Sequence, residues 1–172
     1  MKQEAKFLPI SEYQKRFFLE WTLAPQEILY NVSMVNRITG NLNRKALKQA
    51  SEEVIKCNEV FFARYSKNGE ICWCCDFNVD DFYQESTFDP KQPAELQLRE
   101  ILNHPFDLTK DVLVKFYLVR SENVDNEFYF IMTGHHIIAD AIHAQQISIQ
   151  IQTAYNQLVE GKSISLNINK TF

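Results

Sequence analysis

Apolar side chains recur at helical spacing in four stretches of the chain. In residues 11–23, aromatic residues fall four positions apart and therefore lie on one face of a helix. Ser11 opens this stretch and Gln14 follows three positions later, a pair that caps a helix N-terminus reciprocally. The pattern predicts four helices, at residues 11–23, 43–58, 94–102 and about 140–160.

Alternation of apolar and polar positions, together with turn residues, indicates the strands. Residues 30–38 alternate as a half-buried strand does. Residues 61–66 and 70–76 flank the Lys-Asn-Gly sequence of residues 67–69, which is typical of a hairpin turn. Two further strands are expected at 112–120 and 127–134. Because helices and strands alternate without a strict βαβ rhythm, the prediction is an α/β fold, a two-layer sandwich of a mixed β-sheet with helices packed on one face.

The composition excludes several classes of function. A chain of 172 residues that is 45% hydrophobic can form one domain with its own core. Four glycines, without a Walker or dinucleotide-binding pattern, argue against a phosphate-binding loop. A net charge of -4 with scattered basic residues argues against nucleic acid as a partner. No apolar run is long enough for a bilayer and the N-terminus lacks a signal-peptide core, so we expect a cytoplasmic protein without a membrane partner.

Three of the four cysteines lie in the segment Ile-Cys-Trp-Cys-Cys-Asp at residues 71–76. A structural zinc site usually needs a second pair of Cys or His ligands at matching spacing, and the sequence offers none. The segment is therefore interpreted as a strand with small apolar thiols in a reducing compartment, and no metal is expected.

The candidate chemistry lies between the last predicted strand and the last predicted helix, at His135, His136 and Asp140. A histidine can act as a general base near neutral pH, because its unperturbed pKa is about 6.5. Other interpretations stay open. The histidine pair can be structural, and Asp140 can simply cap the helix that follows. A metal site made by His136, Asp140 and His143 would lack a second shell.

The sequence His-His-Ile-Ile-Ala-Asp-Ala at residues 135–141 resembles the HHxxxDG motif of nonribosomal peptide synthetase condensation domains, which chloramphenicol acetyltransferase-like acyltransferases share. Three further segments resemble the same family in the same order, at residues 8–32, 40–65 and 104–120. The chain as a whole, residues 1–172, is therefore similar to the N-terminal lobe of a condensation domain, with a chloramphenicol acetyltransferase-like fold and with the C-terminal lobe absent.

The resemblance implies a function: amide bond formation between donor and acceptor aminoacyl or peptidyl thioesters. Two lobes would enclose a tunnel, and peptidyl carrier proteins would reach it from opposite ends on phosphopantetheine arms, with no cofactor bound directly. The acceptor amine would attack the donor thioester near His136, which acts as a base or positions the amine. The resemblance gives Asp140 a structural role beside an arginine. If strand alternation persists to this point, His135 points away from the side of His136 and would support the loop. As an isolated lobe, the enzyme would be incomplete.

The sequence departs from the family pattern at the glycine of the motif and in a second segment, where Asn58 aligns with a histidine of the family. Ala141 replaces the glycine of the motif, and Phe62 aligns with an arginine of the family. Arg64 lies on the same strand face as Phe62 if that strand is regular, so it is the candidate partner of Asp140. Alternative functions are an epimerization domain, a free-standing acyltransferase of the same superfamily, and a non-catalytic lobe that docks a carrier protein. The departures give weight to the last of these.

Overall fold

The computed structural model describes residues 6–73 and 78–166. In chain order the elements are β1 (Lys6–Leu8), α1 (Glu12–Leu23), β2 (Asn31–Thr39), α2 (Arg44–Cys57), the 3-10 helix η1 (Glu59–Phe62), β3 (Ala63–Tyr65), β4 (Ile71–Trp73), α3 (Val79–Phe82), β5 (Tyr83–Thr87), α4 (Ala94–Leu102), β6 (Val114–Arg120), β7 (Glu127–His135) and α5 (Ala141–Val159). All four predicted helices are present, and so are the five predicted strands, although residues 74–76 of one of them lie outside the described residues.

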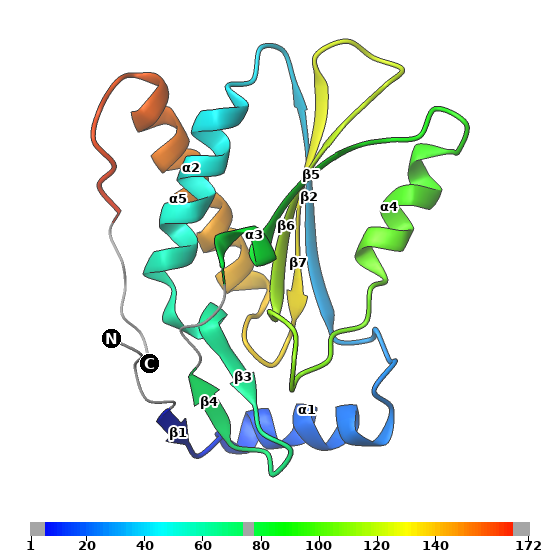
Figure 1. Cartoon of the computed structure of the whole chain (residues 1–172), viewed down its shortest axis with the longest axis vertical. Coiled ribbons are helices and arrows are strands. Elements are labelled where there is room, and N and C mark those ends of the chain that lie inside the picture. The colour runs from blue at the N-terminus through cyan, green and yellow to red at the C-terminus, as the bar shows by residue number, and fades with distance from the viewer. Residues whose placement is uncertain (1–5, 74–77, 167–172) are drawn as a thin grey trace.

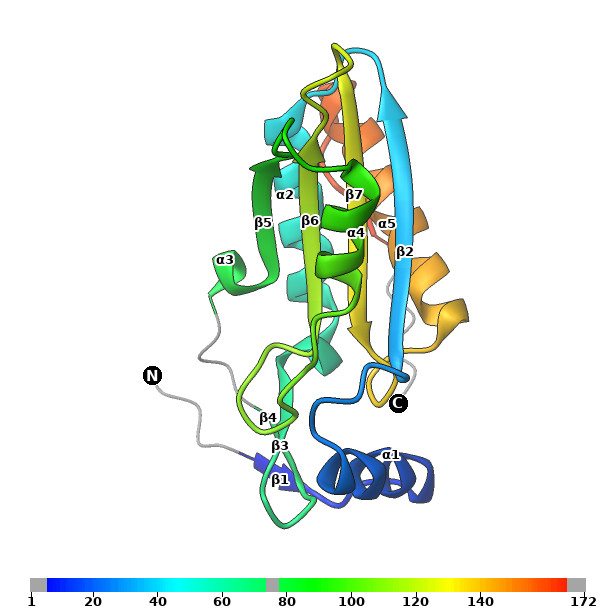
Figure 2. The ribbon, with the colours of Figure 1, turned by 90° about the vertical axis from the view of Figure 1, so that its right-hand side faces the viewer.

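The main sheet has four strands in the order β2-β7-β6-β5, which stand side by side in Figure 2. β7 pairs antiparallel with both β2 and β6, whereas β5 pairs parallel with β6, so the predicted mixed sheet is confirmed. The sequence pattern did not predict β5. Its first residue, Tyr83, is buried but its other four residues are exposed, and a strand of that kind leaves no apolar alternation to read.

Helices α2 and α5 pack side by side on one face of this sheet (Figure 1). Their buried residues recur at three- and four-residue spacing, as an amphipathic helix on a sheet requires. Ala50 and Val54 of α2, and Ile147 and Ile151 of α5, join the large core cluster. The prediction of a sheet with helices on one face is confirmed for these two helices.

Helix α4 lies on the opposite face of the sheet (Figure 1). It forms a third layer, whereas the sequence predicted two layers with the helices on one face. Leu98 and Ile101 of α4 pack against a smaller core cluster made by Phe88, Val119 and Ile131. The physical reason is that β6 and β7 carry apolar residues on both faces, and a strand that is apolar on both faces must be covered twice.

A second, three-stranded sheet has the order β1-β4-β3 and is antiparallel throughout. The predicted hairpin between β3 and β4 is confirmed, and Gly69 supplies the positive φ of 78° that its turn needs. The expectation that Phe62 and Arg64 share a strand face is wrong. Phe62 ends η1, and the chain only becomes extended at Ala63.

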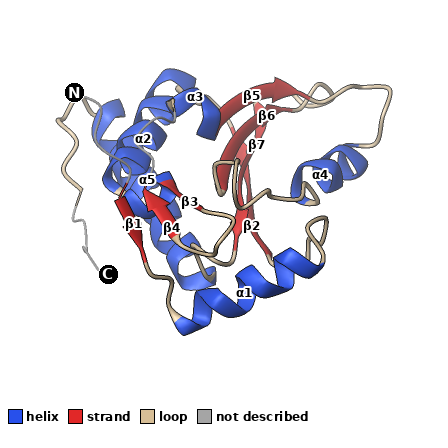
Figure 3. Cartoon of the chain, turned by 60° about the horizontal axis from the view of Figure 1, so that its bottom comes forward, coloured by secondary structure: helices blue, strands red, loops and turns tan. Residues whose placement is uncertain are grey.

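Helix α1 crosses the end of the main sheet at which β7 stops, and it runs roughly across the strand direction (Figures 1 and 3). The predicted capping box is confirmed: the Ser11 side chain accepts from the Gln14 N–H, and the Gln14 side chain accepts from the Ser11 N–H at 3.0 Å. The Trp21 indole donates to the Phe106 carbonyl at 3.0 Å. A hydrogen bond from the Gln14 side chain to the Ile137 carbonyl places α1 beside the loop that joins β7 to α5. Among residues 6–73 and 78–166, no helix combines the length and the apolar character that a membrane span needs.

Candidate active site at the end of strand β7

The loop of residues 136–140 joins β7 to α5 and holds the candidate motif. Its backbone is fixed by the residues that directly precede β6 and β2: the His135 N–H donates to the Leu113 carbonyl at 2.9 Å, and the His136 N–H donates to the Tyr30 carbonyl at 2.8 Å. The Ile138 N–H closes a turn back onto the His135 carbonyl at 3.1 Å. The two histidines therefore stand at the rigid end of a sheet, where their directions are set by the backbone.

His135 points into the protein and is only 2% exposed. Its Nδ1 accepts the N–H of Ile137 at 3.1 Å, so it holds the following loop. Burial, and to a smaller extent the neighbouring His136, lowers the pKa of His135 to about 4. A neutral, hydrogen-bonded imidazole in this position is suited to supporting the loop rather than to exchanging protons with a substrate.

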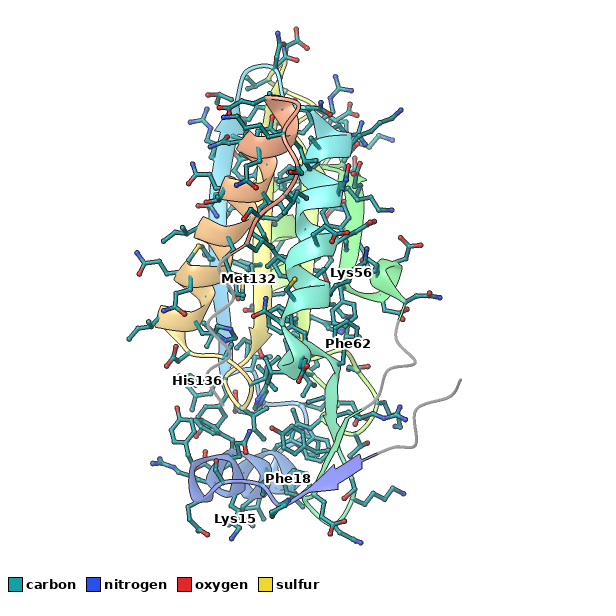
Figure 4. The ribbon with its side chains drawn as sticks, turned by 90° about the vertical axis from the view of Figure 1, so that its left-hand side faces the viewer. Lys15, Phe18, Lys56, Phe62, Met132 and His136 are labelled. Atoms are coloured by element: carbon teal, nitrogen blue, oxygen red, sulfur yellow. The ribbon has the colours of Figure 1, made fainter. Side chains whose placement is uncertain are left out.

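His136 lies half-buried on the side of the loop that faces α1; Figure 4 shows it between α5 and α1. Its ring stacks on Phe17, with ring centroids 5.2 Å apart and planes 15° from parallel. Its Nδ1 lies 3.2 Å from the hydroxyl of Tyr13. The hydrogen bonds of the described residues engage the imidazole at Nδ1 only, which leaves Nε2 for a reactant.

Gln14 ties α1 to this loop. Its side-chain amide donates to the Ile137 carbonyl at 3.4 Å and to the hydroxyl of Tyr65 at 3.2 Å. Tyr65 is almost fully buried, and burial raises the pKa of its hydroxyl far above the ordinary range. The capping residue predicted from the sequence is therefore also a tether between α1, β3 and the histidine loop.

Asp140 is exposed and caps α5, with its carboxylate accepting the N–H of His143 at 2.8 Å. The ion pairs among the described residues do not join Asp140 to Arg64. The side chain of Asp140 turns back onto the first turn of its own helix. This geometry favours the helix-cap interpretation.

Ala141 is the first residue of α5 and has no special backbone conformation. Within residues 6–73 and 78–166, Asn126 is the only non-glycine residue with a positive φ. A glycine is therefore not required at Ala141 by the backbone, and the departure from the family motif is conformationally harmless here.

A hollow of about 370 Å³ lies away from the histidines, between α4 and strands β5 and β6. Its lining includes the polar residues Gln97 and His104 and the apolar residues Phe88 and Val119. No cluster of three or more His, Cys, Asp or Glu that could hold a metal is found in the part of the chain that the structure describes, and Cys74 and Cys75 fall outside that part.

Sequence reasoning located the histidine loop but missed the aromatic residues that contact His136. The four-residue spacing of Tyr13 and Phe17 predicts that they share one face of α1, which is the face that contacts His136. That spacing shows which side chains share a face, but it does not show what the face contacts.

Solved structures of known enzymes share this fold. The starter condensation domain of the rhizomide synthetase RzmA superposes with a TM-score of 0.81 at 19% identity, covering 94% of this chain and 40% of the other. VibH, a nonribosomal peptide synthetase condensation enzyme, superposes with a TM-score of 0.78 at 22% identity, covering 91% of this chain and 37% of the other. The fold is thus that of condensation enzymes.

The sequence assigns the family. The condensation domain profile matches residues 4–172, and the chain therefore belongs to the condensation domain family. A linear gramicidin synthase of Brevibacillus parabrevis is 27% identical over 169 residues, which span 94% of this chain and 3% of that protein. Gramicidin S synthase 2 of Aneurinibacillus migulanus is 29% identical over 150 residues, which span 87% of this chain and 3% of that protein. The chain thus corresponds to a small part of these synthetases and to less than half of the solved condensation chains.

Proposed function

We propose that this chain is the N-terminal lobe of a condensation domain and that it supplies His136 to amide bond formation. The observation that carries the proposal is the placement of His136 in a chain of this family. The imidazole stands at the rigid end of β7, is stacked on Phe17, and has Nε2 left for a reactant. His135 and Asp140 act as structural supports, one through Ile137 and the other as the cap of α5.

The reaction joins an amine to a thioester. The acceptor nitrogen attacks the donor carbonyl carbon, the carbon–sulfur bond breaks, the donor sulfur leaves as a thiolate, and the nitrogen gives up one proton. Nε2 of a neutral His136 accepts that proton, or holds the amine by a hydrogen bond in attack geometry. The proton then reaches the thiolate or solvent, so that the products are an amide and a thiol.

The partners are a donor and an acceptor carrier protein, each presenting its acyl group on a phosphopantetheine arm. A second lobe would provide the other wall of the tunnel, a proposal that the 40% coverage of the solved condensation chain supports. Holding two reactants in attack geometry supplies a large share of a bimolecular rate, so one lobe alone lacks much of the catalytic power.

The test uses a complete condensation domain that contains this lobe, with loaded donor and acceptor carrier proteins. We expect His136→Ala to lower the condensation rate about 10²–10⁴-fold while the melting temperature stays within the error of the parent. His104→Ala, which removes an exposed imidazole on the α4 side of the sheet, is the matched control. A parental rate for His136→Ala would contradict the proposal and favour a lobe that only docks carrier proteins.

A further inference from the structure

Two aromatic rings of α1, those of Tyr13 and Phe17, contact the imidazole of His136. Tyr13 packs edge-on against Phe17, with centroids 4.8 Å apart at 77°, and Phe17 stacks on His136 at 5.2 Å. The Tyr13 ring meets the His136 ring at 6.2 Å and 63°, and its hydroxyl lies 3.2 Å from Nδ1. We call Tyr13, Phe17 and His136 the aromatic bracket. Two of its rings come from α1, and the third lies 123 residues away.

The two partners of His136 restrict different motions of the imidazole. Phe17 is buried and also contacts Tyr30 at 4.9 Å, so its ring is a fixed surface that sets the plane of the imidazole. Stacking leaves open which nitrogen carries the proton. The hydrogen bond at Nδ1 decides that, because a neutral imidazole has one N–H donor and one acceptor nitrogen.

We propose that Tyr13 is a positioning residue for His136, with its hydroxyl oxygen accepting the Nδ1 proton so that the lone pair is at Nε2. This inference rests on the proposed function, which needs Nε2 as the acceptor. The opposite tautomer would place a proton on Nε2 and would make it a donor, unable to take the proton of the attacking amine. The Tyr13 side chain is 57% exposed, so its own O–H proton can be donated to water while its oxygen accepts from His136.

The proposal is tested first on the 172-residue chain by NMR, from the imidazole nitrogen shifts of His136 at a pH well above the ordinary histidine value of about 6.5. We expect the parent to carry the proton on Nδ1. Tyr13→Phe keeps the ring contact with Phe17 and removes only the hydroxyl, so the fold should be retained while the population shifts toward the Nε2-protonated tautomer. A parent that already carries the proton on Nε2, or a variant with unchanged His136 shifts, would overturn the proposal.

The second measurement is the rate of a complete condensation domain that contains this lobe. Loss of a hydrogen bond that orients a reactive imidazole typically costs 10–100-fold in function where it has been measured at metal-bound histidines, and we expect a loss of about that size for Tyr13→Phe. Tyr155→Phe is the control, because it removes a hydroxyl that accepts the N–H of Asn43 at 3.2 Å, outside the aromatic bracket. It should change neither the rate nor the His136 shifts.

The outcomes separate the two proposals. If His136→Ala is impaired but Tyr13→Phe condenses at the parental rate, Tyr13 is not a positioning residue and the proposed function stands. If His136→Ala is itself unimpaired, the proposed function fails, and the nitrogen shifts alone decide whether Tyr13 sets the tautomer.

Discussion

Two adjacent histidines occupy opposite environments at the end of β7. Successive side chains of a strand point to opposite faces, and this alternation continues to the last residue of β7, so His135 faces the core and His136 faces α1. One imidazole is buried with its pKa lowered, and the other is half-buried beside a tyrosine hydroxyl. The same residue type therefore has two physical roles at neighbouring positions.

The buried histidine predicts a loss of stability in mild acid. The pKa of His135 falls from 6.5 to about 4 on folding, so between these values the unfolded chain binds a proton that the folded chain does not. The contribution of His135 to the free energy of unfolding should be fully present above about pH 6.5. It should fall by up to about 3 kcal/mol as the pH is lowered toward 4. His143, whose pKa burial also lowers, adds to the slope in the same direction.

Denaturant melts of the parent and of His135→Asn between pH 7 and pH 4 measure this contribution. Asn offers an oxygen to the Ile137 N–H but does not titrate, so the difference between the two proteins should shrink as the pH falls. His104→Asn removes an exposed imidazole and should follow the parent. Parallel curves for His135→Asn and the parent would show that His135 is not held neutral by burial.

Asp140 should behave as a helix cap. Its carboxylate accepts the His143 N–H in an exposed position, and Asp140→Ala should cost about 1 kcal/mol of unfolding free energy, against about 3–5 kcal/mol for breaking a buried ion pair. Asp140→Asn keeps the acceptor and should stay close to the parent. In denaturant melts, the effects of Asp140→Ala and Arg64→Ala on the free energy of unfolding should add in the double variant. A coupling energy well above about 0.5 kcal/mol would show that the two side chains do form a pair.

At the scale of elements, α1 is held by a few specific contacts rather than by a wide apolar face. Phe17 is its one fully buried residue, and Gln14 and Trp21 add hydrogen bonds to the Ile137 and Phe106 carbonyls. Tyr30 also donates to Glu20. An element attached in this way should detach before the rest of the fold unfolds.

Gln14→Ala should loosen α1 selectively. The change removes one half of the capping box and leaves the buried Tyr65 hydroxyl without its partner, a loss of about 1–3 kcal/mol. Amide hydrogen exchange should speed up in α1 and in the histidine loop, while α2 and α5 keep the parental protection. Lys15→Ala, an exposed change on the same helix, is the control. Uniformly faster exchange would mean that Gln14 stabilises the whole fold instead.

The elements that the sequence predicted are those whose signals are local. The cap at Ser11 and the turn at Gly69 depend on residues next to them in the chain, and both are confirmed. The position of α4 and the break at η1 depend on tertiary packing. Phenylalanine is common in strands, yet Phe62 lies at the end of a 3-10 helix, where it packs edge-on against Phe82.

The candidate site also contains residues that the sequence predicted and residues that it did not. The loop with His135, His136 and Asp140 is continuous in sequence, so its motif can be read directly. Its partners are not continuous with it. Tyr13 and Phe17 contact His136 only because α1 crosses the end of the sheet, and a single sequence holds no local signal for that contact.

At the scale of the whole molecule, one large core cluster joins α1, α2, α5 and both sheets. Because the smaller cluster under α4 packs on the same sheet, we expect one cooperative unfolding transition for the chain alone, detected as coincident melts by fluorescence and circular dichroism. If the proposed function holds, the chain alone should nevertheless give no amide above background with loaded carrier proteins, because a single lobe of the proposed tunnel would not hold both reactants. A complete domain with the same carriers is the positive control, and robust condensation by the chain alone would contradict the expectation.

The position of α1 also has a consequence for synthesis on the ribosome. Tyr13 and His136 are separated by 123 residues, and at about 5–20 residues per second roughly 6–25 s pass between their translation. During that interval α1 has no histidine loop to pack against and Phe17 lacks its final burial. Helix α1 is therefore made before the histidine loop and docks late, and the nascent chain carries an exposed aromatic helix that chaperones can recognise until β7 is complete.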